Sequence, residues 1–161
     1  MNKTKIIFIC HGNICRSTMA EFLFRDLAKK SGVLQDYEIS SRATSTEELG
    51  NPVHPGTRRV LAGLGISTEG KFAQQITAKE CAAADLLVIM DENNRRNLRP
   101  FLGNHAHKVS TLLSWAGIDR DISDPWYTGD FEKTFDDVDL GCRALFLALE
   151  KKRERKNKTG L

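Results

Sequence analysis

An apolar run that leads directly into a polar loop, and then into a helical pattern, is the feature that most limits the fold. The run Lys5–Cys10 is rich in Ile and Phe and is typical of a buried strand. The loop HGNICRS, residues 11–17, follows at once, and apolar residues then recur at helical spacing from Ala20 to Ala28. A strand joined so closely to a helix predicts a β-α-β unit with parallel strands.

Three further segments have the composition of strands, and helical patterns lie between them. The expected strands are Tyr37–Ser41, Asp85–Met90 and, with a weaker pattern, Lys108–Thr111. Strands that alternate with helices predict an α/β layer fold. In such sheets ligands bind beyond the carboxyl ends of the strands, where the strand order reverses, and the loop 11–17 lies at such an end.

Helix-start and helix-stop signals define the helices in the middle of the chain. One is expected at about 55–64, and a short one opens with the pair Thr77 and Glu80, which has capping-box spacing. Asp91 is expected to cap a further helix, which Pro100 stops.

The first and last helices carry their own signals. Thr18 and Glu21 resemble a capping box at the start of the first helix. Segment 123–131, SDPWYTGDF, is expected to be an irregular loop before the last helix. That last helix is long, and five of its apolar residues share one face: Phe135, Val138, Cys142, Leu145 and Leu149.

Length and composition are those of one ordinary globular domain, here residues 1–161. Apolar residues make up 40% of the chain and charged residues 28%. No apolar run approaches the roughly 20 residues that span a bilayer, and no signal peptide is recognised, so we expect a cytoplasmic protein. The four cysteines are then expected to be thiols, and their spacing completes no zinc site, so no metal is expected.

The basic character of the chain lies in its C-terminal tail, residues 151–161. The chain carries a net charge of +3, and the tail KKRERKNKTGL contributes +5, which leaves −2 on residues 1–150. A basic tail can contact nucleic acid or a membrane surface. The interpretation we favour is the solvated end of a helix, whose lysines complement the helix dipole, so no nucleic-acid partner is expected.

The loop after the first strand is predicted to bind an anion. A tight strand-to-helix loop directs several backbone amides into one concavity, and the helix N-terminus adds partial positive charge. We expect Gly12 to permit backbone angles closed to other residues, and Asn13 to tolerate a left-handed conformation. Arg16 offers a planar fork that matches two phosphate oxygens.

Cys10 lies at the mouth of this site, where we expect it to be a thiolate at neutral pH. Ser17 is placed to donate a hydrogen bond to that sulfur, which makes Cys10 a candidate nucleophile for a covalent phosphoenzyme. The alternative is that Cys10 and Cys15 are small buried apolar residues, which is common for free cysteines. The arginine and the loop context favour the nucleophile.

A phosphate ester also needs a general acid for its leaving group, and Asp124 is the candidate. Pro125 stiffens its loop, and Trp126 and Tyr127 can form an aromatic wall beside the substrate. The alternative, a turn aspartate before proline, is weighted equally on spacing alone.

These motifs together resemble the low-molecular-weight protein tyrosine phosphatase family over nearly the whole chain. The matching segments are CHGNICRS, SSRATSTEELGNP, MDENN after a strand, and DPWY, in the family's order and roughly its spacing. The resemblance implies a three-layer, doubly wound α/β fold with a four-stranded parallel sheet flanked by helices. It also implies a monomer without cofactor or metal, which acts on phosphotyrosine-containing proteins and releases inorganic phosphate.

The resemblance also assigns roles to individual residues. Cys10 matches the nucleophile, Arg16 the phosphate-binding arginine, and Asp124 the general acid. Cys15 matches a thiol that can form a reversible disulfide with Cys10 and protect it from irreversible oxidation. The residues that match loop support, phosphate binding, the substrate rim and a structural acid are His11, Gly12, Asn13, Ile14, Ser17, Ser41, Glu47, Trp126, Tyr127 and Asp91.

The chain departs from the family pattern at five positions. His11 stands where the family usually has an apolar or small residue, and Thr18 replaces a proline. Lys71 stands where a histidine often supports the loop, and Gln74 replaces an arginine. Glu47 occupies a rim position that is often aromatic. These departures bear on substrate preference and rate rather than on the chemistry.

Three rival functions remain to be weighed. A thiol-linked arsenate reductase shares this loop, but it needs a relay of further cysteines, and Cys81 lacks the expected partner nearby. A protein arginine phosphatase of the same fold is disfavoured, because within the family Ile14 accompanies tyrosine phosphatases and threonine accompanies arginine phosphatases. A non-catalytic phosphate-binding module would not need both Cys10 and Asp124.

Overall fold

The computed structural model describes residues 2–159 and contains four strands. They are β1 Thr4–Cys10, β2 Tyr37–Ala43, β3 Leu86–Ile89 and β4 Val109–Thr111. The helices are α1 Arg16–Lys30, α2 Pro55–Ala62, α3 Ala78–Ala83, α4 Glu92–Leu102, α5 Pro125–Thr128 and α6 Phe131–Thr159. Short 3-10 turns occur at Leu34–Asp36, Ala106–Lys108 and Leu113–Ala116.

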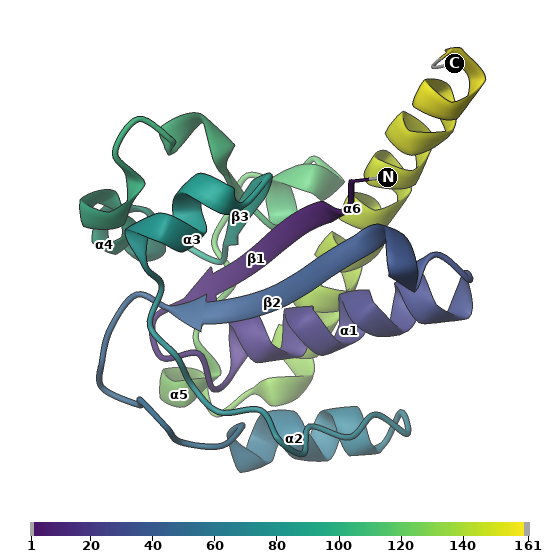
Figure 1. Ribbon diagram of the computed structural model, residues 1–161. Coiled ribbons are helices and arrows are strands. Elements are labelled where there is room, and N and C mark those ends of the chain that lie inside the picture. The colour runs from purple at the N-terminus through teal and green to yellow at the C-terminus, as the bar shows by residue number, and fades with distance from the viewer. Residues whose placement is uncertain (1, 160–161) are drawn as a thin grey trace.

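All four strands form one parallel sheet in the order β2-β1-β3-β4. β1 is therefore central, with β2 on one side and β3 on the other. The chain leaves β1 into α1 on one face of the sheet and leaves β3 into α4 on the opposite face, as Figure 1 shows. The connection from β1 to α1 and the connection from β3 to α4 therefore diverge at the carboxyl ends of β1 and β3. The crevice between such diverging connections is where α/β sheets bind their ligands.

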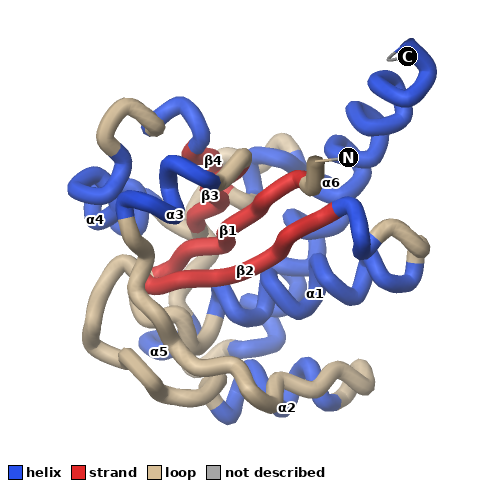
Figure 2. Tube along the Cα trace, in the orientation of Figure 1, coloured by secondary structure: helices blue, strands red, loops and turns tan. Residues whose placement is uncertain are grey.

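The sheet is covered on both faces, which confirms the three-layer, doubly wound α/β fold (Figure 2). Ile6 and Phe8 of β1 pack in a core cluster with α1 and α6, whereas Ile7 and Ile9 pack in a second cluster with α3 and α4. This split follows from the strand geometry, because successive side chains point to opposite faces. The apolar run of β1 is unbroken because both of its faces are buried.

Phe24 of α1 is the centre of an aromatic group that joins β1, β2 and α6. Its ring centroid lies 5.8 Å from that of Phe8, 5.3 Å from that of Tyr37 and 5.7 Å from that of Phe146, with the last two rings edge-on. Such tilted and edge-to-face geometries are favourable for aromatic pairs. α1 is thereby fixed against the sheet, and with it the helix end that faces the loop 11–17.

Two expectations about helix ends are confirmed. Thr77 and Glu80 form a complete capping box at α3, and Asp91 caps α4 by accepting a hydrogen bond from the Asn94 N–H. The apolar face of α6 is also confirmed: Val138, Cys142 and Leu145 are fully buried, and Phe135 and Leu149 pack against them.

Three local expectations are wrong. Pro100 lies inside α4, which ends at Leu102, because a proline near the last turn of a helix removes only one backbone hydrogen bond. Segment 123–131 is not wholly irregular, since α5 occupies Pro125–Thr128. Thr18 does not cap α1: the helix begins at Arg16, and the Thr18 hydroxyl donates to the Cys15 carbonyl at 3.0 Å.

The basic tail continues α6 as far as Thr159, and its last two residues, 160–161, lie outside the described residues. Its end projects past the sheet, away from the carboxyl ends of the strands (Figure 1). Most of its side chains are exposed, as expected for a solvated helix end. Arg153 is an exception, because it pairs with Glu150 and Asp36. No helix within residues 2–159 has the length and apolarity needed to cross a membrane.

Candidate active site

The loop between β1 and α1 turns at Asn13, whose φ of 58° lies in the left-handed region. Asn tolerates this conformation better than most residues, as the sequence predicts. Gly12 does not adopt the left-handed region, so the expectation that it supplies the unusual backbone angles is wrong. A Cβ at Gly12 would instead lie 3.2 Å from Cγ of Glu48, so a neighbouring loop approaches closely here.

The sulfur of Cys10 lies at the end of β1 and faces the first turn of α1. Ser17 Oγ lies 3.0 Å from Cys10 Sγ, and the Ser17 backbone N–H donates to the same sulfur at 3.4 Å. The amides of a helix's first turn have no partner within the helix and carry partial positive charge. This arrangement is complementary to a negatively charged sulfur.

A chain of hydrogen bonds beneath the loop sets the direction in which Ser17 donates. The Gln74 N–H donates to Asn13 Oδ1 at 3.2 Å, which fixes the orientation of the Asn13 amide. Asn13 Nδ2 then donates to Ser17 Oγ at 2.8 Å and to Ser41 Oγ at 2.9 Å. Because Ser17 Oγ accepts from Asn13, its own proton is free to point to the sulfur of Cys10.

A buried ion pair anchors this chain from below. Ser41 Oγ donates to Glu21 Oε1 at 2.5 Å, and Lys71 Nζ lies 3.2 Å from the same oxygen. Lys71 also donates to the Ser41 carbonyl at 3.0 Å. Burial lowers the pKa of Lys71 below its usual value, and the carboxylate of Glu21 opposes this shift. Lys71 therefore supports the loop with a cation that a carboxylate balances.

Arg16 is 2% exposed and links the loop to two other segments of the chain. Its Nη1 donates to Asp91 Oδ2 at 2.6 Å and to the Ile122 carbonyl at 2.7 Å, and its Nη2 lies 3.5 Å from Asp124 Oδ2. Burial lowers the pKa of Arg16, but the charges of Cys10, Asp91 and Asp124 outweigh burial, so the pKa lies above its usual value. The guanidinium is thus a fixed cation beside the loop.

Asp124 lies at the start of α5, and its two carboxylate oxygens have different partners. Its Oδ1 accepts from the Trp126 N–H at 3.0 Å, and its Oδ2 faces Arg16. Its side chain remains 23% exposed and borders the pocket, so a ligand in the pocket can reach it. The short helix α5, which the sequence pattern did not predict, forms because Pro125 and the Asp124 cap favour a helix start.

Cys15 differs from Cys10 in its surroundings, although both line the same pocket. Burial raises the pKa of the Cys15 thiol well above its usual value, and the charges of Cys10 and Asp124 add to this effect. Cys15 is therefore protonated at neutral pH. Cys10, Cys15, Cys81 and Cys142 are all free.

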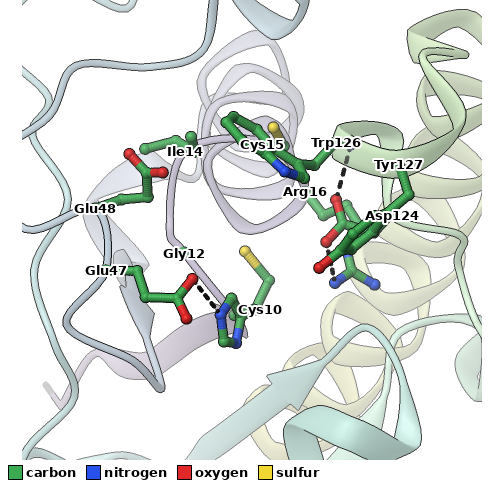
Figure 3. A pocket seen from close by; sticks show the side chains of 11 residues that line it. Cys10, Gly12, Ile14, Cys15, Arg16, Glu47, Glu48, Asp124, Trp126 and Tyr127 are labelled. Atoms are coloured by element: carbon green, nitrogen blue, oxygen red, sulfur yellow. Dashed lines mark hydrogen bonds and ion pairs between the residues drawn. The ribbon is translucent and has the colours of Figure 1, made fainter.

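Eleven residues line a pocket of about 500 Å³ that opens to solvent: Cys10, His11, Gly12, Ile14, Cys15, Arg16, Glu47, Glu48, Asp124, Trp126 and Tyr127. Figure 3 shows Cys10 between two walls, with Glu47 and Glu48 on one side and Asp124 with the two aromatic residues on the other. Trp126 and Tyr127 are 58% and 83% exposed. Asn13, Ser17 and Ser41 lie beneath the floor rather than in the pocket.

Four contributors to the site were not predicted from the sequence: Glu21, Glu48, His54 and Ile122. Glu21 was interpreted as part of a capping box, and the backbone carbonyl of Ile122 has no sequence signal at all. His54 stacks on Phe131 with ring centroids 4.9 Å apart and meets the Trp126 ring edge-on at 5.9 Å. Only Glu48, next to the predicted Glu47 in a loop that matches the family, had a signal that could have identified it.

Known proteins are similar to this chain along most of its length. The family model described as "Low molecular weight phosphotyrosine protein phosphatase" matches residues 5–155. The low molecular weight protein-tyrosine-phosphatase YfkJ of Bacillus subtilis is 36% identical over 153 residues, which cover 92% of this chain and 97% of that protein. A relative of the same description from Staphylococcus aureus, PtpA, is 34% identical over 85% of this chain and 88% of its own length.

Solved structures agree with the sequence comparison. The crystal structure of YfkJ superposes with a TM-score of 0.91 at 35% identity and covers 94% of this chain and 98% of that one. The low molecular weight protein tyrosine phosphatase SP-PTP of Streptococcus pyogenes gives a TM-score of 0.81 at 36% identity, over 91% and 93% of the two chains. The chain therefore belongs to the low-molecular-weight protein tyrosine phosphatase family, whose members are phosphoric monoester hydrolases.

Proposed function

We propose that this chain hydrolyses phosphotyrosine on proteins, and small aryl phosphates, through a phosphocysteine intermediate on Cys10. One observation carries the proposal: a single pocket brings together the Cys10 sulfur with its hydrogen-bond donors, the Arg16 cation and the Asp124 carboxyl group. These are a nucleophile, a phosphate ligand and an acid, which are the groups that transfer of a phosphoryl group to sulfur requires.

In the first step the phosphate group sits on the loop amides and the Arg16 guanidinium. The Cys10 thiolate attacks phosphorus, the P–O bond to the tyrosine oxygen breaks, and Asp124 in its protonated form gives that oxygen its proton. The amides and Arg16 stabilise the charge on the three equatorial oxygens of the transition state. Because the donors are already in place, little reorganisation accompanies the reaction.

In the second step a water molecule attacks the phosphocysteine. Asp124, now a carboxylate, takes a proton from the water, and the S–P bond breaks to return the Cys10 thiolate and release inorganic phosphate. The Ser17 hydroxyl, 3.0 Å from the sulfur, then donates a hydrogen bond to the thiolate and stabilises the returning charge. One group must be ionised while the other is protonated, so we expect the rate to be highest on the acid side of neutrality.

The pocket shape supports an aryl phosphate as substrate. The recessed sulfur and the flanking Trp126 and Tyr127 rings suit a long, flat phosphotyrosine better than the short side chain of phosphoserine. Ile14 lines the pocket and is the residue that disfavours a protein arginine phosphatase. Arsenate reduction is disfavoured because Cys81 is fully buried in the cluster with α3 and α4, apart from the pocket.

Three further features of the proposal concern the protein's setting. We propose that one chain, folded as a single domain, suffices as a monomer, since Cys10, Arg16 and Asp124, the groups that the proposed reaction needs, already meet in the pocket of one chain. We place it in the cytoplasm, where free thiols such as its four cysteines persist. Cys15 is the proposed partner of Cys10 in a reversible disulfide under oxidation.

A substrate panel tests the proposal. We expect metal-free wild-type protein to hydrolyse p-nitrophenyl phosphate and phosphotyrosine peptides, and to act far more slowly on matched phosphoserine and phosphoarginine peptides. Cys10→Ser should abolish turnover, and mass spectrometry of rapidly quenched wild-type protein should find phosphate on Cys10. Turnover that survives in Cys10→Ser, or a faster reaction with phosphoarginine, would contradict the proposal.

A further inference from the structure

One wall of the pocket carries two adjacent carboxylates, and the mechanism proposed above uses neither of them. Glu47 and Glu48 belong to the loop between β2 and α2 and face the pocket opposite the aromatic wall (Figure 3). They lie at the mouth, where the segments on either side of a bound phosphotyrosine would pass. This position makes them candidates for choosing among substrates.

Contacts with the rest of the site hold both carboxylates in place. Asn51 Nδ2 donates to Glu48 Oε2 at 2.6 Å, and the side chain of Glu48 packs closely over Gly12. Glu47 Oε2 lies 2.9 Å from Nε2 of His11, yet the Glu47 side chain is 70% exposed. The two charges are therefore positioned at the wall, with Glu47 open to a bound peptide and Glu48 partly buried behind it.

The charge balance of the pocket leaves these carboxylates available for a cation. Among the described residues that line the pocket, the basic side chains are Arg16, which already faces Asp91 and Asp124, and His11, which pairs with Glu47 at the exposed edge. The charge of Glu48 also reaches the floor of the pocket. The pKa of Cys15 is raised mainly by burial and by the charges of Cys10 and Asp124, and the charge of Glu48 adds a smaller contribution. The mouth is therefore a region of negative potential around a floor that binds an anion.

We propose that Glu47 and Glu48 make the enzyme prefer phosphotyrosine whose neighbouring residues are Lys or Arg. The proposal rests on the phosphotyrosine phosphatase activity and concerns the same pocket. A cationic neighbour is attracted to the two carboxylates at the mouth, and an acidic neighbour is repelled. Since the contact is exposed to solvent, the preference weakens as ionic strength rises.

Three phosphotyrosine peptides that differ only in the residues flanking phosphotyrosine test the proposal: Lys, Gln or Glu on both sides. We expect wild-type kcat/KM at low ionic strength to be about tenfold higher for the Lys peptide than for the Glu peptide. The ratio should fall several-fold in about 0.5 M salt, where the Debye length is only a few ångströms. Equal rates for the two peptides would overturn the proposal.

Variants assign the preference to the two residues. Glu47→Gln with Glu48→Gln removes both charges while keeping an oxygen that can accept from Asn51 and His11, and it should bring the ratio to below about twofold. Replacement of both by Lys should reverse the preference. Glu154→Gln, an exposed change on the projecting end of α6, is the matched control and should leave the ratio at its wild-type value.

Hydrolysis of p-nitrophenyl phosphate, which has no flanking residues, separates this proposal from the proposed function. If the wild-type protein does not hydrolyse it, the phosphatase activity fails. Suppose that it does, but that the ratio of kcat/KM between the Lys and Glu peptides is close to one or does not change in the double Gln variant. In that case the phosphatase activity stands, and only the proposed preference for Lys or Arg next to phosphotyrosine fails.

Discussion

The floor of the pocket and its rim are built in opposite ways. The floor is formed by residues 10–17, which are buried except for His11 and Gly12, and Asn13, Arg16 and Ser17 are each at most 2% exposed. Asn13 and Arg16 bond to distant segments of the chain, and Ser17 bonds to Cys10 and Asn13 within the floor. In the rim, Glu47, Trp126 and Tyr127 are exposed and Glu48 is partly buried, and contacts with His11 and Asn51 hold the two carboxylates.

This difference separates two tasks. Transfer of a phosphoryl group needs donors held to a fraction of an ångström, which only a packed and hydrogen-bonded setting provides. Recognition of a protein segment tolerates looser contacts, and exposed side chains can change with little cost to the fold. We therefore expect changes in the floor to affect the rate for every substrate, and changes in the rim to affect the choice among substrates.

After the loss of Cys10 itself, the largest effect is expected from Arg16→Lys in the floor. Lys keeps the positive charge but loses the planar fork that bonds Asp91 and Ile122 and that, in the proposed mechanism, also binds the phosphate oxygens. We expect kcat for p-nitrophenyl phosphate to fall about 1000-fold, since the loss concerns the transition state. Steady-state kinetics measure this, with the exposed Arg59→Lys as control. A loss below about tenfold would contradict the role assigned to the fork.

Asp124→Asn should have the next largest effect, because it removes the acid but leaves an amide oxygen that can still cap α5. We expect kcat to fall about 100-fold for aryl phosphates with poor leaving groups, and much less for those whose phenols are already acidic. A leaving-group series compares these rates, with Asp119→Asn as the exposed control. An equal loss across the series would show that Asp124 is not the acid.

A structural effect is expected from Asp137→Asn, which affects the segment that leads to Asp124. Arg120 forms two hydrogen bonds to Asp137 of α6, at 2.9 and 2.8 Å, and these lower the pKa of the Asp137 carboxyl group. A lowered pKa in the folded state means that the ionised carboxylate stabilises the fold. At neutral pH we expect the variant's Tm to fall by about 3–6 °C.

The pH dependence of that Tm difference follows from the direction of the shift. The stabilisation is fully present above the pKa of an unfolded aspartate, about 3.9, and is lost as the pH falls through the lower folded-state value. Thermal melts should therefore show a Tm difference between the wild-type protein and Asp137→Asn that is constant from pH 7 to pH 5 and becomes smaller below about pH 4. Asp136→Asn, on the exposed side of α6, is the control. A gap that grows towards acid pH would contradict this assignment.

The smallest effect is expected at the rim, from Tyr127→Ala. The ring is 83% exposed, and in the proposed complex it would contact substrate only through stacking, which contributes about 1 kcal/mol. We expect KM for a phosphotyrosine peptide to rise about fivefold with kcat nearly unchanged, and Tyr127→Phe to restore the wild-type KM. A fall in kcat comparable to that of a floor variant would remove the distinction between the two regions.

The sequence predicts the strands, the main helices and the floor because these depend on local patterns. Runs such as Lys5–Cys10 show burial directly, and the loop 11–17 has a composition that suits an anion. The predictions of local structure fail where the position or side chain of a single residue determines whether a helix continues or starts. Pro100 is tolerated because α4 ends two residues later, and α5 forms because the Asp124 side chain caps it.

What the sequence could not predict are contacts between segments that only the fold brings together. The pair of Glu21 and Lys71 beneath the loop spans 50 residues, and the bond from Arg16 to Asp91 spans 75. Neither partner carries a local signal for the other. The left-handed residue is Asn13 and not Gly12, where an added Cβ would lie 3.2 Å from Cγ of Glu48.

The hydrogen bond from Arg16 to the carbonyl of Ile122 spans 106 residues and has a consequence for biosynthesis. A nascent chain carries its nucleophile and guanidinium from the start, but the carbonyl that orients the guanidinium leaves the ribosome only after most of the protein has been made. Catalytic competence therefore arrives late in translation, and a truncated product that stops short of Ile122 holds a thiol without a finished anion site.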